Sequence, residues 1–456
     1  MWFFILFITL LLLTAFTYFI FDKELMAPGL MICLMFDVSV TYSLYNYERW
    51  QLTGYGAEMV LLALLGISCF ISADIITRKL IYRGETETTF KTQRTEIPYS
   101  RIILAVIIGV LAVILYVMYL RRIIWYFGLS QGINDAIQTV RKKRQAGELT
   151  GGLGLPVFIN LLIKSVQMFS VLFSFAYVYN IVIRRHEKKD NWLLVPVVLH
   201  VIVSLLQSKR GDVVQDIIAV MVFSYIVWSR YERSCSRINR WFLLGSTLTV
   251  VTVSPLFFIA TRIMGRYDAD SIKSIDMFYY IGVYLSGGLR SFDLYLKQGG
   301  SAARFFGEET FVTLNNFIFS HFGGGESYVR HLEYRSGNGW GSGNIYSSFR
   351  RFYHDFGIWG ICILSFIQGL ISSLVYERTR REKTDDISFS IVLYSFFAYT
   401  IVYIPIDDLF FSSVISVSGL AKTVLLYIIY IFVFMDEGSC KEVRNRILRT
   451  AFLKRS

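Results

Sequence analysis

Charged residues are scarce in this chain of 456 residues. Asp, Glu, Lys and Arg make up 18% of the sequence, against about 25% in soluble domains, while hydrophobic residues make up 54%. This balance is typical of a chain whose main solvent is a lipid bilayer. The composition therefore excludes an ordinary soluble domain and indicates an integral membrane protein.

Cysteine and proline are also rare. The five cysteines have no paired spacing of the metal-ligand kind, which argues against a zinc site or a disulfide framework. The six prolines and 33 glycines do not gather into a linker that would mark a separate soluble domain. We therefore expect one membrane domain over residues 1–456, without a metal or another cofactor.

Long apolar runs fill most of the sequence. A helix that crosses a hydrocarbon layer of about 30 Å needs roughly 20 residues, and most of these runs reach that length. The first run lacks a basic n-region and a small-residue cleavage site, so we expect it to be retained as a span. We predict an all-α, polytopic membrane protein with about 11 transmembrane helices, at residues 2–21, 25–45, 57–76, 102–127, 155–183, 191–207, 213–229, 242–260, 353–376, 388–406 and 415–435.

Basic residues between these spans predict the topology. Lys and Arg cluster at 78–94, 184–189, 230–240, 378–383 and in the tail 436–456, all on one side when eleven spans are counted. Basic loops stay on the cytoplasmic side, so the tail is expected inside and the N-terminus outside. The expected layout is spans 1–8 at 1–260, a large extracytoplasmic loop at 261–352, spans 9–11 at 353–435 and a basic cytoplasmic tail.

Two basic groups fall on the outer side, against this preference. Arg141 and Arg144 belong to a run of four basic residues after the fourth span, and Lys209 and Arg210 lie in a short turn between the sixth and seventh. Guanidinium groups near lipid headgroups suit a phosphate-bearing ligand, because they offer a fixed fork of donors to its oxygens. The same side chains also suit ordinary anionic headgroups, and both interpretations stay open.

The expected outer loop is rich in arginine and aromatic residues. Its candidate ligand-binding arginines are Arg262, Arg266, Arg290 and Arg350, and an aromatic run near its start includes Tyr280. Aromatic faces stack on sugar rings, but Tyr and Trp belts at a membrane interface have the same composition.

Several ionisable residues are candidates for proton transfer. His354 and Asp355 lie at the outer end of the ninth span, where either could accept a proton from a hydroxyl group. Asp37 and His200 fall within predicted spans, where ionisable groups are costly and indicate either function or pairing inside the bundle.

The strongest local pattern runs into the ninth span. It reads Asn344-x-Tyr346, followed by Tyr353-x-Asp355-Phe356-Gly357-x-x-Gly360. With the many spans, the large late loop and the Ser208-Lys209-Arg210-Gly211 turn, this pattern resembles the Wzy-type O-antigen and capsular oligosaccharide repeat-unit polymerases of bacteria.

The resemblance implies a metal-independent glycosyltransferase of the GT-C type in the bacterial inner membrane. Such an enzyme moves a growing glycan from undecaprenyl pyrophosphate onto a fresh lipid-linked repeat unit, on the outer side. By this analogy Arg210 would hold pyrophosphate and Arg290 would assist the leaving group. The sugar site or the base would come from Asn344, Tyr346, Tyr353 and Asp355.

Two other functions fit parts of the same pattern. An O-antigen ligase would share the outer arginines and the large loop, and a flippase for lipid-linked oligosaccharide would also need basic groups for pyrophosphate. The resemblance implies membrane lipids, a chain-length regulator and a flippase of the same pathway as partners. The net charge of +12 lies largely in loops that set topology, so it does not indicate a nucleic-acid partner.

Overall fold

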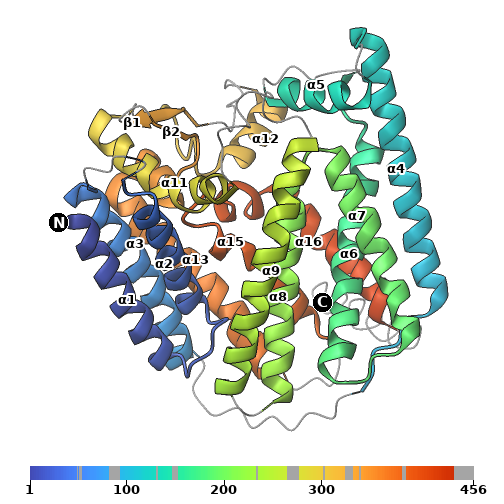
Figure 1. The fold of residues 1–456 in the computed structure, drawn as a ribbon, viewed down its shortest axis with the longest axis horizontal. Helices are drawn as coiled ribbons and strands as arrows, with labels where there is room; N and C mark the ends of the chain where they lie inside the picture. The colour runs from blue at the N-terminus through green and yellow to red at the C-terminus, as the bar shows by residue number, and fades with distance from the viewer. Residues whose placement is uncertain are drawn as a thin grey trace, which may run out of the picture.

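The computed structural model describes residues 1–48, 50, 54–81, 93–129, 132–145, 153–232, 235–263, 277–300, 303–323, 332–337, 340–382 and 387–435. In these ranges the chain is a bundle of helices with one short antiparallel hairpin (Figure 1). The predicted all-α, polytopic fold class is therefore confirmed.

The N-terminal half of the described chain is entirely helical apart from its connections. Its helices are α1 (Trp2–Ile20), α2 (Pro28–Tyr45), α3 (Ala57–Ile76) with its extension η1 (Thr77–Ile81), α4 (Tyr99–Phe127), α5 (Ile133–Gln145), α6 (Val157–Val182), η3 (Lys188–Leu193), α7 (Leu194–Leu206), α8 (Arg210–Tyr231) and α9 (Cys235–Ile263). The C-terminal half comprises α11 (Met277–Gln298), α12 (Val312–Phe322), β1 (Arg335–Gly337), β2 (Trp340–Gly343), α13 (Ser348–Arg381), α14 (Phe389–Phe397), α15 (Tyr399–Val402), η4 (Phe410–Val414) and α16 (Val417–Phe434).

Nine helical segments in the described ranges are long and apolar enough to cross a membrane. They comprise α1, α2, α3 with η1, α4, α6, η3 with α7, α8, α13 and α16. The expected spans at 242–260 and 388–406 correspond to α9, which contains Pro255, and to the short helices α14 and α15. Neither is among the nine, so the count of about 11 stays a prediction.

Small residues allow α13 to pack closely against α3. A Cβ atom at Gly369 would lie 2.7 Å from the carbonyl oxygen of Phe70, and one at Gly66 would lie 2.6 Å from the Phe349 ring. Such glycines let helix backbones approach one another within a bilayer, where packing rather than water exclusion drives association. The long helix α13 is thereby fixed within the N-terminal part of the bundle.

The basic loops meet at one end of the bundle, as their charge pattern predicts. Arg78 pairs with Glu377 at 3.2 Å, and Arg94 pairs with Asp190 at 2.6 Å. Arg230 donates a hydrogen bond to the Thr379 carbonyl. The hairpin, α12 and α5 lie at the opposite end, which is uppermost in Figure 1. The side of the membrane that each end faces remains a prediction.

The segment 261–352, expected as a loop, is largely folded in its described part. It contains α11, which packs against α2, as well as α12 and the hairpin, and α13 already begins at Ser348. The sequence did not reveal α11 because Arg290, Asp293 and several Ser and Gly residues interrupt its apolar face.

Candidate functional site

The first turn of α13 lies where α11 and the segment 404–408 meet. The Ser348 N–H donates to the Ile404 carbonyl at 2.8 Å, and its hydroxyl donates to the Asp407 carbonyl at 3.1 Å. The Ser347 N–H lies 3.4 Å from the Gly288 carbonyl of α11. Two segments distant in sequence therefore position the helix start that carries Arg350, Arg351, His354 and Asp355.

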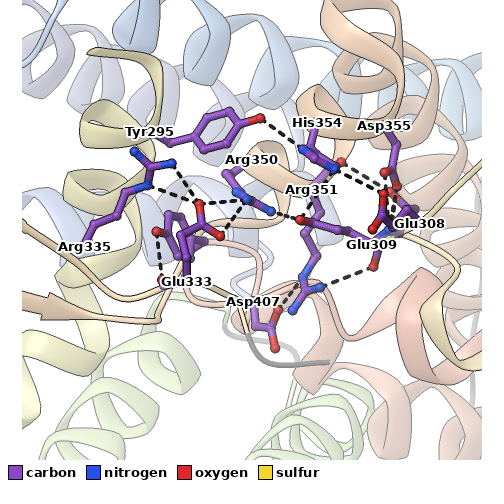
Figure 2. Close-up of polar contacts among 12 residues, drawn as sticks. Tyr295, Glu308, Glu309, Glu333, Arg335, Arg350, Arg351, His354, Asp355 and Asp407 are labelled. Atoms are coloured by element: carbon purple, nitrogen blue, oxygen red, sulfur yellow. Dashed lines mark hydrogen bonds and ion pairs between the residues drawn. The ribbon is translucent and has the colours of Figure 1, made fainter. Parts of the chain in front are cut away.

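Arg350 is buried at the centre of this site (Figure 2), with 2% of its side chain exposed. Its guanidinium pairs with Glu309, and its Nη2 atom lies 2.9 Å from both carboxylate oxygens of Glu333. The rings of Tyr295 and Tyr346 lie 4.5 and 5.0 Å from the guanidinium carbon. Two carboxylates and two aromatic faces thus offset part of the cost of burying this charge.

Arg351 anchors two further segments. Its Nε atom lies 2.9 Å from the Asp407 carboxylate, and its Nη1 atom donates to the Glu309 carbonyl at 3.3 Å. Glu309 therefore contacts both arginines, through its side chain and its backbone. The two adjacent arginines hold the segments 303–311 and 404–408 against α13 (Figure 2).

His354 faces a phenol on one side and carboxylates on the other. The Tyr295 hydroxyl lies 3.1 Å from Nδ1, and the nearest Glu309 oxygen lies 3.6 Å from Nε2. Burial raises the pKa of Tyr295, so this hydroxyl keeps its proton. Tyr295 and Nδ1 are within hydrogen-bond distance, and the tautomer of the imidazole ring decides which of them donates.

Asp355 and Glu308 fix the backbone around His354. Asp355 accepts the N–H groups of Glu309 and Thr310, the latter at 2.7 Å. Glu308 accepts the backbone N–H and the Nε–H of Arg304, both at 2.8 Å. Burial raises the pKa of Glu308, but these hydrogen bonds and the charge of Arg304 lower it by more. The net shift of the pKa is therefore downward. Both carboxylates act as acceptors that hold this turn.

Arg290 is buried on α11, with 4% of the residue exposed. Its guanidinium carbon lies 5.2 Å from the Trp50 ring centre, and its Nη2 atom lies 3.5 Å from the Trp50 carbonyl. Asp293, one turn further along α11, accepts the Gly56 N–H at 2.7 Å. These contacts hold α11 against the segment between α2 and α3, close to the α13 start.

Arg210 is the first residue of α8, with 6% exposed. The turn before it contains Ser208 in the left-handed region, with φ of 56°. The Lys209 N–H donates to the Ser204 carbonyl at 3.0 Å, which ties the turn to α7. Asp212, in the first turn of α8, and Asp407 both lie near enough to Tyr403 to act on it electrostatically. The turn before Arg210 and the Arg351–Asp407 ion pair therefore belong to the same end of the bundle.

A group of hydrogen-bonded polar side chains lies within the membrane-spanning helices α6, α7 and α8. His200 Nδ1 lies 2.8 Å from Asp216, His200 Nε2 lies 3.1 Å from the Ser204 hydroxyl, and Gln167 donates to Asp216 at 3.2 Å. His200 is thus paired inside the bundle, one of the two outcomes expected from its sequence position. Asp37 likewise accepts a hydrogen bond from Thr14 of α1.

The structure brings only some predicted site residues together. Tyr346 joins the cluster by donating to the Glu333 carbonyl at 3.1 Å, whereas Tyr353 donates to Glu58 of α3 at 3.1 Å. Asn344 is half-buried after β2, and Lys209 is exposed. Arg141 lies apart from the cluster in α5. The side chains of Arg144, Arg262 and Tyr280, and the whole of Arg266, lie outside the described part of the chain.

Sequence reasoning missed four important members of the cluster. Glu309, Glu333 and Asp407 supply the carboxylates for the two arginines, and Tyr295 supplies a ring face and the contact with His354. Glu333 and Asp407 lie in different segments, and no local motif marks them. The Arg350-Arg351 pair was the available signal, since two adjacent arginines at a buried helix start need acidic partners.

Searches against protein-family models, curated proteins and solved structures find no match for this chain. The fold and the site therefore define its class, a multi-pass helical membrane protein with a cluster of buried arginines at one end.

Proposed function

We propose that this protein is a polysaccharide polymerase that joins lipid-linked oligosaccharide repeat units on the outer side of the bacterial inner membrane. A hydroxyl of a fresh unit attacks the anomeric carbon of the growing chain, whose bond to undecaprenyl pyrophosphate breaks. The hydroxyl proton passes to a base, and the lipid pyrophosphate leaves with the bonding electron pair. The O-antigen and capsular polymers are the candidate products.

The observation that carries this proposal is a group of four buried arginines at one end of an apolar bundle. Arg210, Arg290, Arg350 and Arg351 have 6%, 4%, 2% and 2% of their surface exposed. Ionisable groups in membrane proteins are costly and concentrate where they serve a ligand or a pathway. Positive charge fixed at one position stabilises the negative charge that develops on a leaving pyrophosphate.

We assign the four arginines two different roles. Arg350 and Arg351 are held by Glu309, Glu333 and Asp407, so we assign them to positioning the segments around the site. We assign the pyrophosphate to Arg210 and Arg290, in agreement with the resemblance in the Ser208–Gly211 turn.

His354 is the better candidate base of the two adjacent residues. Asp355 already accepts two backbone N–H groups, whereas the Nε2 atom of His354 lies beyond hydrogen-bond distance of either flanking carboxylate. A general base must have a lone pair available to the acceptor hydroxyl. In this proposal His354 carries its proton on Nδ1 and donates it to the Tyr295 oxygen, which leaves the lone pair on Nε2.

The test compares glycan ladders from cells that lack their own copy of the gene and express either the wild type or Arg210→Ala. We expect the variant to reduce the ladder to single repeat units at normal membrane abundance. Arg121→Ala is the matched control, because Arg121 is an exposed arginine on α4. A normal ladder from Arg210→Ala would contradict the assignment of Arg210.

The deletion strain alone distinguishes the other two functions. Long polymer that stays attached to its lipid carrier would show that the protein is a ligase. Single units retained on the cytoplasmic face would show that it is a flippase. Either result would overturn the polymerase proposal.

A further inference from the structure

Two lysines lie close together within apolar membrane-spanning helices. Lys164 is in the second turn of α6, about 10 Å along the helix from its first residue, and Lys422 is about 7.5 Å along α16. Lys422 lies near enough to repel the ammonium group of Lys164, and both side chains are half-buried. The pair therefore concentrates two positive charges in one place.

Neither lysine forms an ion pair with an acidic residue in the ranges that the structure describes. Arg350, Arg351 and the arginines near Glu377 all have carboxylate partners. Two like charges in a medium of low dielectric constant repel one another strongly and also lose hydration. An anion that bridges the two ammonium groups would remove both costs.

The surroundings of the pair indicate an amphiphilic ligand. Leu161, one turn from Lys164, is 50% exposed, and Leu420 and Val424, on either side of Lys422, are 66% and 50% exposed. The helices are in direct contact, because the rings of Phe169 and Phe432 lie 6.1 Å apart. An apolar surface around two cations matches a lipid, whose chains contact the leucines while its phosphate reaches the lysines.

The pair also lies beside the helices of the candidate site. Lys164 shares a helix face with Gln167, which donates to Asp216 of α8, the helix that begins at Arg210. Both α6 and α16 start at the end of the bundle that carries α5 and α12. The start of α6 packs with α5 in one hydrophobic core, and Thr313 of α12 donates a hydrogen bond to the Ser412 carbonyl just before α16.

We propose that Lys164 and Lys422 bind the phosphate or pyrophosphate group of a membrane lipid at the contact between α6 and α16. The site needs no polymerase activity to exist. Only the identification of the lipid as the glycan carrier rests on the proposed function.

The test uses the purified full-length protein in non-ionic detergent, with the melting temperature measured before and after lipid addition. The probes are undecaprenyl phosphate, phosphatidylglycerol, phosphatidylcholine and inorganic pyrophosphate. The variants are Lys164→Gln, Lys422→Gln and the double variant. A double lysine-to-arginine variant retains both charges, and Lys189→Gln removes a lysine that is 44% exposed and pairs with Glu96.

The proposal predicts that the Gln substitutions change the melting temperature in opposite directions without and with an anionic lipid. Without lipid, each Gln variant should melt at a higher temperature than the wild type, because the repulsion is removed. With an anionic lipid the order should reverse, and apparent affinity should fall about tenfold for each lysine removed. The double arginine variant and Lys189→Gln should bind as the wild type does.

The probes then identify the source of the phosphate. Tighter binding of undecaprenyl phosphate than of phosphatidylglycerol would support a carrier site, and equal binding would support a site for bulk anionic headgroups. Binding of pyrophosphate alone would support the phosphate chemistry without a contribution from the chains. Unchanged binding of anionic lipid by the double Gln variant would overturn the proposal, whatever the glycan ladders show.

Discussion

The two ends of α13 each carry a buried ionic network, and the two are built with opposite polarity. At the C-terminal end one carboxylate, Glu377, lies 3.2 to 3.6 Å from the three arginines Arg78, Arg380 and Arg381. At the N-terminal end one arginine, Arg350, lies between Glu309 and Glu333. The partners of Glu377 come from helical segments, whereas those of Arg350 come from segments outside helices.

This difference separates a network that joins helices from one that holds loops. Arg78 also pairs with Asp74 at 3.4 Å and Glu24 at 3.2 Å, so the C-terminal network ties α3 and the α1–α2 connection to α13. The N-terminal network holds the segments that surround His354. We expect changes at the first end to affect the stability of the whole bundle, and changes at the second to affect the site.

The largest effect is expected from Glu377→Ala. The residue is fully buried, and its loss would remove the carboxylate that contacts Arg78, Arg380 and Arg381 together. Removing one partner of a buried ion pair costs about 3–5 kcal/mol, so membrane abundance and melting temperature should fall together. Glu232→Ala is the control, because Glu232 pairs with Arg237, whose side chain is 66% exposed. Equal melting temperatures for both variants would remove the basis for treating this end as the structural anchor.

A second substitution targets the N-terminal end alone. A Cβ atom at Gly288 would lie 2.0 Å from the Pro405 carbonyl, so Gly288→Ala should force α11 away from the start of α13. Overpacking of this kind costs about 1–3 kcal/mol, and we expect a shorter glycan ladder as well as a lower melting temperature. Gly245→Ala provides the comparison, since a Cβ there meets no atom within 4 Å. An unaltered ladder and melting temperature for Gly288→Ala would show that this junction tolerates displacement.

A smaller effect is expected from Glu333→Gln. The Glu333 side chain is 39% exposed, so losing its charge should cost at most about 1 kcal/mol of overall stability. The local consequence should be larger, because Arg350 and Arg335 both bind this carboxylate. Hydrogen exchange should become faster in β1 and β2 and stay unchanged in α3. Faster exchange throughout the bundle would mean that this network, too, holds the fold as a whole.

The smallest effect concerns pH. The pKa of Glu308 is lowered in the folded protein, so its contribution to stability is complete above the ordinary value of about 4.3 and is lost as the pH falls through the lowered value. Thermal unfolding should be measured at about pH 6 and at about pH 3, on either side of that pKa. The melting temperature should fall less between these two conditions for Glu308→Gln than for the wild type. Arg304→Gln should flatten the profile similarly, and parallel profiles for all three proteins would argue against this linkage.

The sequence predicted the bundle better than it predicted the site. Apolar length was sufficient for nine of the eleven expected spans in the described ranges, because this signal is contained in one continuous stretch. Asp355 was predicted through a local motif, and Arg350 and His354 through their residue types in the same segment. Glu333 and Asp407 were not, since their role depends on which distant segments the fold brings to α13. The helix α11 was missed because its buried face carries Arg290 and Asp293, which resemble loop residues when only hydropathy is considered.

Gly357 interrupts α13 between its two networks, with φ of 63° and ψ of −149°. Only glycine adopts this conformation without strain, and the backbone on its two sides need not share one helical direction. The orientation of the first nine residues of α13 is therefore not dictated by the transmembrane part that Glu377 anchors. Substitutions can accumulate around the arginine pair, and so alter what the site accepts, without a compensating change at the far end of the same helix.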